Sequence, residues 1–107
     1  MLHIGVDEYV FDVLMPDLAG HDHSPSAFLV YLFLWAALFR SEQKRVSASL
    51  QQIAEGTGLS KSAVQAGMRI LKRRRLVMVS RKSSTATPEY ELLRHWIRRR
   101  ARLQRSG

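Results

Sequence analysis

The 107-residue chain contains no cysteine. It therefore cannot form a disulfide, hold a metal through thiolates or use a thiol as a nucleophile. The absence suits a reducing cytoplasm, which is where we expect the protein to act. Hydrophobic residues make up 46% of the chain, which is typical of a folded globule rather than a disordered chain, and the length is that of one domain.

The chain also lacks a long hydrophobic run. Its longest uninterrupted apolar stretch covers the thirteen residues 27–39, whereas a membrane-spanning helix needs roughly 18 or more. We therefore interpret this stretch as a buried core helix and expect no membrane partner. The N-terminus is acidic and has no basic stretch before an apolar one, so we expect no signal peptide.

Signs of catalysis are missing as well. No carboxylate pair, Ser/His/Asp arrangement or phosphate-binding glycine loop is recognisable. His21 and His23 flank Asp22, but two histidines one residue apart in a loop rarely hold a metal ion. We expect a protein that is not an enzyme, without metal or cofactor and without a domain for a small-molecule effector.

Acidic residues are scarce after residue 40. Residues 1–40 carry five acids and one base, a net charge of −4, whereas residues 41–107 carry sixteen bases and four acids, a net charge of +12. A basic surface of this kind attracts polyanions. Nucleic acid is the partner we favour, and an anionic membrane surface ranks behind it.

The pattern of the chain predicts a mixed α+β fold that is mainly helical. The β-branched and aromatic residues of 1–15 predict a strand or extended arm, followed by a loop over 16–23. Ser24 as N-cap and Pro25 at the first helical position begin a helix that runs to about Arg40 and is apolar on every side. Such a helix must be covered all round, by the domain or by a second subunit.

Two short helices follow, separated by a tight turn. Ser49 and Gln52 have the spacing of a capping box, and Gly56 and Gly58 are expected to end the first helix because glycine adopts positive φ. Ser60 caps the second helix, in which a buried stripe of Val64, Met68 and Leu71 is expected. Gly67 lies mid-helix at a cost of about 1 kcal/mol, which close packing against the large side chains of the first helix would explain.

Short apolar segments predict the strands. Residues 46–48 are expected to form a short strand, and residues 76–79 and 89–93 a hairpin around the polar loop 81–87. From Arg94 the chain is rich in arginine. This tail is expected to be a nucleic-acid arm, a helix at a dimer interface, or an interfacial membrane helix, in that order of preference.

The interrupted helix resembles a helix-turn-helix. The small Ala54 lets the two helices approach, Gly58 makes the turn, and Leu59 and Val64 lock the corner. Together with the hairpin, residues 24–93 are similar to a winged helix domain with a three-helix core and a wing, flanked by an N-terminal arm (1–23) and a basic tail (94–107). The stretch LSKSAVQAGMRILKRRRLV resembles recognition helices of bacterial winged helix regulators, and SPSAFLVYLFL is similar to the first helix of plasmid and phage replication initiators.

The resemblance implies sequence-specific binding of double-stranded DNA through helix 60–75 and the wing. A small transcriptional regulator is the function we favour, with a replication-initiation protein or a protein-interaction module as alternatives. Many family members have glycine directly after the recognition helix, where this chain has Arg75. The apolar first helix, with Trp96 and Ile97, predicts a homodimer.

The chemistry of the side chains divides the expected DNA contacts into two groups. Gln pairs with adenine and Arg with guanine in the major groove, so base contacts are expected from Lys61, Ser62, Gln65 and Arg69. The four cations at 72–75 are expected to hold phosphates, to stabilise the C-terminus of the helix through its dipole, or both. The phosphate contacts expected most directly are those of Ser60, Lys72, Arg73, Arg81, Lys82, Arg98 and Arg99.

Overall fold

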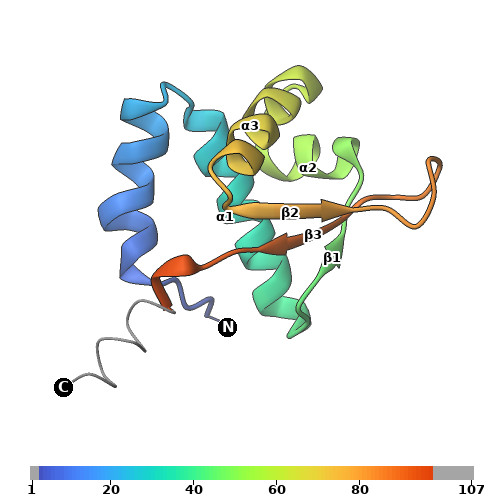
Figure 1. The fold of residues 1–107 in the computed structure, drawn as a ribbon, viewed down its shortest axis with the longest axis horizontal. Helices are drawn as coiled ribbons and strands as arrows, with labels where there is room; N and C mark the ends of the chain where they lie inside the picture. The colour runs from blue at the N-terminus through green and yellow to red at the C-terminus, as the bar shows by residue number, and fades with distance from the viewer. Residues whose placement is uncertain (1–2, 98–107) are drawn as a thin grey trace.

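The computed structural model describes residues 3–97, which form a mixed α+β fold with a small antiparallel sheet (Figure 1). Helices α1, α2 and α3 lie on one side of the sheet, and an N-terminal helical segment, residues 8–21, stands beside α1. In chain order the elements are η1 (Val10–Leu14), η2 (Pro16–His21), α1 (Pro25–Ser41), β1 (Val46–Ser47), α2 (Leu50–Thr57), α3 (Lys61–Arg73), β2 (Val77–Ser80) and β3 (Glu89–Leu92). Among the described residues, no helix is both long enough and apolar enough to cross a membrane.

Helix α1 begins where its sequence predicts. The Ser24 hydroxyl accepts a hydrogen bond from the backbone N–H of Ala27 at 3.2 Å, and Pro25 occupies the first turn. The helix packs against α2, α3, η2 and the sheet. This packing covers only part of its circumference, because Leu29 is 40% exposed and Phe39 46%. The domain by itself therefore leaves an apolar stripe of α1 open.

The prediction for the N-terminus is wrong. Residues 8–21, expected as a strand or arm and then a loop, are helical, with the wide turns of η1 and η2. Val10, Leu14 and Leu18 are at most 2% exposed. Their spacing of four residues places them on one side of a helix, and burying that side in the core outweighs the β propensity of the individual residues.

The turn between α2 and α3 follows the predicted capping. The Ser49 hydroxyl accepts from the Gln52 N–H at 3.1 Å and the Gln52 side chain accepts from the Ser49 N–H at 2.8 Å. Gly58 ends α2 with φ = +78°, and Ser60 caps α3. Gly56 does not help to end α2, because it lies inside the helix. A Cβ at Gly56 would lie 2.2 Å from the ring of Phe33, so this glycine makes room for α1.

Gly67 marks the closest approach of α3 to α1. A Cβ there would lie 3.0 Å from the backbone N and Cα of Ala27. Packing against the first helix is therefore the reason for this glycine, as expected. The contact is with the backbone at the start of α1, however, and not with its large side chains, so no side-chain rotation could relieve a larger residue.

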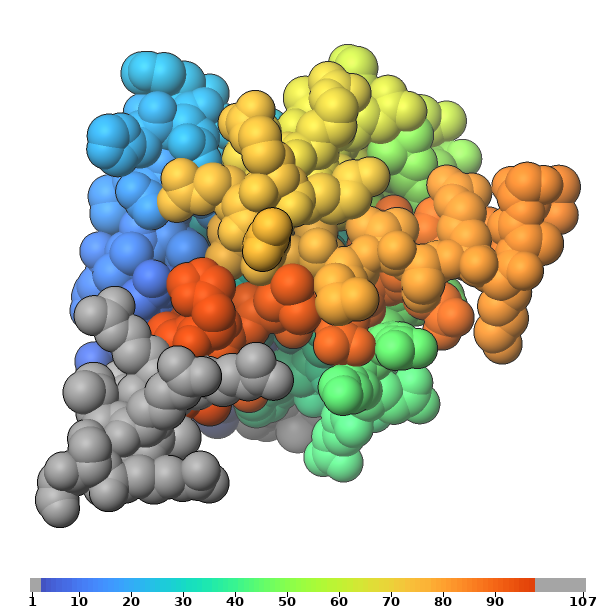
Figure 2. Space-filling model, viewed as in Figure 1, coloured from blue at the N-terminus to red at the C-terminus, as the bar shows by residue number. Residues whose placement is uncertain are grey.

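The three strands are ordered β1–β3–β2, and all neighbours are antiparallel. In the central strand Tyr90 pairs with Val46 on one side and Val79 on the other. All three strands lie close to where the sequence predicts them. The hairpin tip between β2 and β3 projects from the body of the domain (Figure 2).

Arg75 connects α3 to β2 in the left-handed conformation, with φ = +55°. Two backbone bonds close this turn, from Arg75 N–H to the Lys72 carbonyl at 3.0 Å and from Leu76 N–H to the Leu71 carbonyl at 2.9 Å. This is the position at which glycine was expected from the resemblance. A non-glycine residue in this conformation costs roughly 1–2 kcal/mol. The left-handed turn therefore forms even without glycine, and the backbone of the arginine in it is strained.

The two ends of the described chain meet at an aromatic junction. The ring of Trp96 stacks on that of Tyr9, with centroids 4.4 Å apart. The Trp96 indole N–H donates to the Asp7 carboxylate at 3.0 Å, and Arg94 lies 3.4 Å from the same carboxylate. Residues 95–97 form one helical turn. The rest of the predicted tail helix, with Arg98 and Arg99, lies outside the described residues.

Candidate nucleic-acid interface

Helix α3 presents a polar face to solvent. Val64, Met68 and Leu71 are buried as predicted, together with Gly67. The residues expected to contact bases or phosphates from this helix are all exposed: Lys61, Ser62, Gln65, Arg69, Lys72 and Arg73. This face contains no acidic residue, because α3 has none. It is therefore an uninterrupted cationic and hydrogen-bonding surface.

An open groove of about 560 Å³ lies between α3 and the hairpin. Gln65, Arg69 and Lys72 line it from α3, and Arg81 and Tyr90 line it from the hairpin. Two residues expected to contact bases and two expected to contact phosphates thus share one groove. The stretches that supply them are separated in sequence, and the antiparallel pairing of β2 with β3 brings them together.

The residues at the N-terminus of α3 lie apart from this groove. Lys61 borders a separate hollow beside Gln51 and Glu55 of α2. The Ser60 hydroxyl accepts from the Ala63 N–H at 3.1 Å and lies 3.2 Å from the Ser62 hydroxyl. The side chain of Ser60 is thus engaged as the helix cap, although it remains at the surface.

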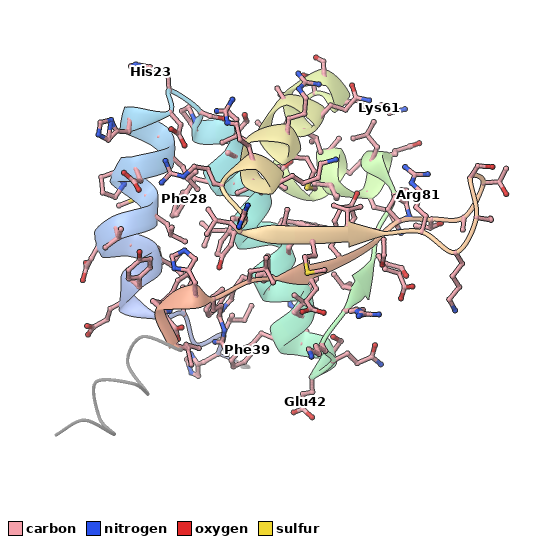
Figure 3. The ribbon with its side chains drawn as sticks, viewed as in Figure 1. His23, Phe28, Phe39, Glu42, Lys61 and Arg81 are labelled. Atoms are coloured by element: carbon pink, nitrogen blue, oxygen red, sulfur yellow. The ribbon has the colours of Figure 1, made fainter. Side chains whose placement is uncertain are left out.

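The hairpin carries two further cations from which phosphate contacts are expected, Arg81 and Lys82. Arg81 stands where the hairpin leaves the body of the domain (Figure 3), and its Nη1 donates to the carbonyl of Ala86 at 3.4 Å. Lys82 is exposed nearer the tip. Burial raises the pKa of Tyr90, and the positive charge of Arg81 acts in the opposite direction.

One cation of the 72–75 cluster is paired with acidic residues of the same chain. Arg74 Nη2 lies 2.5 Å from the Asp17 carboxylate, and its Nη1 lies 3.4 Å from that of Asp22. Both acids belong to the N-terminal segment, so Arg74 fastens that segment to the end of α3. For the cations at 72–75, phosphate contact and stabilisation of the helix C-terminus were both expected, and Arg74 instead pairs with acids of the N-terminal segment. The acids at 17 and 22 were visible in the sequence, but nothing local placed them beside α3.

Alanine substitutions of the neighbouring residues Arg73 and Arg74 should consequently have different effects on the stability of the fold. Arg74→Ala leaves two half-buried carboxylates without their cation and is expected to lower the free energy of unfolding by about 1–2 kcal/mol. Arg73→Ala removes an exposed side chain and should change stability by less than about 0.5 kcal/mol. Urea denaturation of the two variants measures this difference. Equal stabilities would show that the pairing with Asp17 and Asp22 does not form.

The described residues contain no group of three or more potential metal-ligating side chains. Comparison with known proteins adds no relative: no protein-family model, no curated protein and no solved structure matches this chain.

Proposed function

We propose that this protein is a winged helix protein that binds double-stranded DNA. In this proposal α2 and α3 are the helix-turn-helix, α3 is the recognition helix and the β2–β3 hairpin is the wing. The observation that carries the proposal is the convergence of Gln65, Arg69, Lys72 and Arg81 on one groove between α3 and the hairpin. Hydrogen-bonding groups on an exposed helix suit base edges in the major groove, and flanking cations suit phosphates.

The distribution of charge also supports the groove between α3 and the hairpin as the DNA-binding surface. The acids Asp17 and Asp22 are paired with Arg74 at the side of α3 that meets the N-terminal segment. The groove has no acidic residue in its lining, whereas three of its residues are cations. A polyanion approaching the domain is therefore attracted to the groove and not to the N-terminal segment.

Within DNA-binding functions, we propose transcription regulation in the cytoplasm. A replication-initiation protein is the alternative within DNA-binding functions. The protein-interaction alternative would require a partner that is acidic enough to replace DNA at the groove.

Binding to random-sequence duplex DNA at low and high salt tests the proposal. With phosphate contacts from Lys72, Arg73, Arg81 and Lys82, the logarithm of the binding constant should fall against log salt with a slope of about −4. Arg81→Glu should weaken binding strongly. Arg45→Glu changes the net charge equally at an exposed residue that pairs with Glu91 outside the groove, so it should have a much smaller effect. A wild-type protein that shifts no duplex at low salt would contradict DNA binding and favour the interaction module.

We also propose that the protein binds DNA as a homodimer through the open stripe of α1. Exposed Leu29 on this helix is accompanied by Phe11 and Met15 of the N-terminal segment, and the rings of Phe11 and Phe28 are 6.5 Å apart. The stripe has no charged residue between positions 27 and 39. An uncharged helix face can pack on its own copy about a two-fold axis, which would present two recognition helices to a palindromic site.

Sedimentation at tens of micromolar measures this assembly. Wild type should sediment as a dimer, and Leu29→Glu should shift it to a monomer because a carboxylate would be buried in the interface. Met78→Glu is the matched control, because Met78 is 55% exposed on β2, away from the stripe. A monomeric wild type, with and without DNA, would overturn the dimer.

A further inference from the structure

The groove between α3 and the hairpin has an apolar floor beneath its cations. Val64 and Met68 of α3 and Val79 of β2 line it, together with Pro88 and Tyr90. Tyr90 is only 6% exposed and pairs across the sheet with Val79. The ring of Tyr90 therefore forms part of the floor and is held in place by the sheet.

The hydroxyl of Tyr90 has no hydrogen-bond partner among residues 3–97. The wholly enclosed side-chain polar atoms of these residues that lack a hydrogen bond are Asp22 Oδ2 and the Tyr31 hydroxyl. The Tyr90 hydroxyl is not among them, and Tyr90 lines the groove. A phenol at the bottom of an open groove offers one O–H donor at a fixed position.

Cations from both sides line the groove with Tyr90. Arg81 belongs to the hairpin, directly after β2, and its charge acts on Tyr90. Lys72 belongs to α3. A groove that combines a phenol and cations with an apolar floor suits an anion that has an apolar neighbour. A nucleic-acid backbone provides both, in its phosphate and its sugar.

We propose that the groove seats the sugar–phosphate backbone of one DNA strand and that Tyr90 donates a hydrogen bond to a phosphate oxygen. This inference rests on the proposed DNA binding and adds a residue to it. Lys72 and Arg81 neutralise the same stretch of backbone, and the deoxyribose rests on the floor at Val79. Tyr90 is a positioning residue: it fixes the strand beside α3, so that Gln65 and Arg69 on the groove's α3 side meet base edges.

Tyr90→Phe tests the seat because it removes only the hydroxyl. It should weaken binding to every duplex, specific or random, by about tenfold, since a hydrogen bond to a charged group is lost, and leave the melting temperature unchanged. Tyr9→Phe is the matched control: Tyr9 stacks on Trp96 at the junction of the termini and does not line the groove. Its affinity should equal that of wild type. Equal affinities for Tyr90→Phe and wild type, with Arg81→Ala weakened, would overturn the seat and leave DNA binding standing.

A second measurement tests phosphate binding at Tyr90 separately from the binding of duplex DNA. In wild type carrying ¹³C-labelled tyrosine, thymidine 5′-monophosphate should shift the ring signals of Tyr90 and not those of Tyr9, and thymidine without phosphate should shift neither. This result together with a failure to bind any duplex would overturn the proposed function while supporting a phosphate seat. An unmoved Tyr90 signal at millimolar nucleotide would overturn the seat.

Discussion

Replacing Trp96 with alanine is expected to lower the free energy of unfolding by about 3 kcal/mol, the lower end of the range for deleting a buried tryptophan. Trp96 is 7% exposed, its ring stacks on Tyr9, and its indole N–H donates to Asp7. Removing the side chain opens a cavity between the two ends of the described chain. For a domain of this size the loss corresponds to a fall in melting temperature of roughly 10–15 °C, measured by thermal denaturation.

Two variants give this experiment its controls. Ile97→Ala changes the next residue, which is 41% exposed, and should cost less than about 1 kcal/mol. Trp96→Phe keeps an aromatic ring against Tyr9 but loses the bond to Asp7, so its stability should lie between those of wild type and Trp96→Ala. If Trp96→Ala melts like Ile97→Ala, the junction does not contribute to the fold.

The second large effect concerns sequence recognition. Gln65→Ala and Arg69→Ala are each expected to relax the preferred DNA sequence, with a loss of roughly 1–3 kcal/mol on the specific site if the contact is bidentate. Arg81→Ala and Lys82→Ala should instead weaken binding to all sequences alike, and each should flatten the salt dependence by about one unit. Selection of bound sites from a random pool, followed by titrations at several salt concentrations, measures both properties.

The two groups must change binding in different ways, because Gln65 and Arg69 are expected to contact bases and the hairpin cations to contact phosphates, although Arg81 lines the same groove as Gln65 and Arg69. Arg45→Ala is the control for charge, since Arg45 pairs with Glu91 outside the groove. If Gln65→Ala and Arg81→Ala both lower affinity uniformly without changing the selected site, α3 is not a recognition helix. The protein would then be a nonspecific nucleic-acid binder.

Sequence alone determined the elements whose signals are local. Ser24, Ser49 and Ser60 begin their helices as predicted, since a capping hydroxyl acts on backbone groups within three residues. Gly58 takes the positive φ that only its missing side chain makes easy. The strands follow from short apolar segments, and the exposed cationic face of α3 follows from the spacing of its buried residues. The polar residues of α3 in the proposed interface therefore follow from the sequence.

Tertiary structure decided the features that depend on distant partners. Residues 8–21 are helical because Val10, Leu14 and Leu18 pack into the core. Without that packing, the β-branched residues of this segment predict a strand. Arg74 leaves the cationic face because Asp17, 57 residues away in the sequence, lies beside it. Tyr90 joins the groove only through its pairing with Val79 in the sheet. In each case the deciding interaction is a contact between segments far apart in the chain, which helix caps, turns and hydrophobic spacing do not encode.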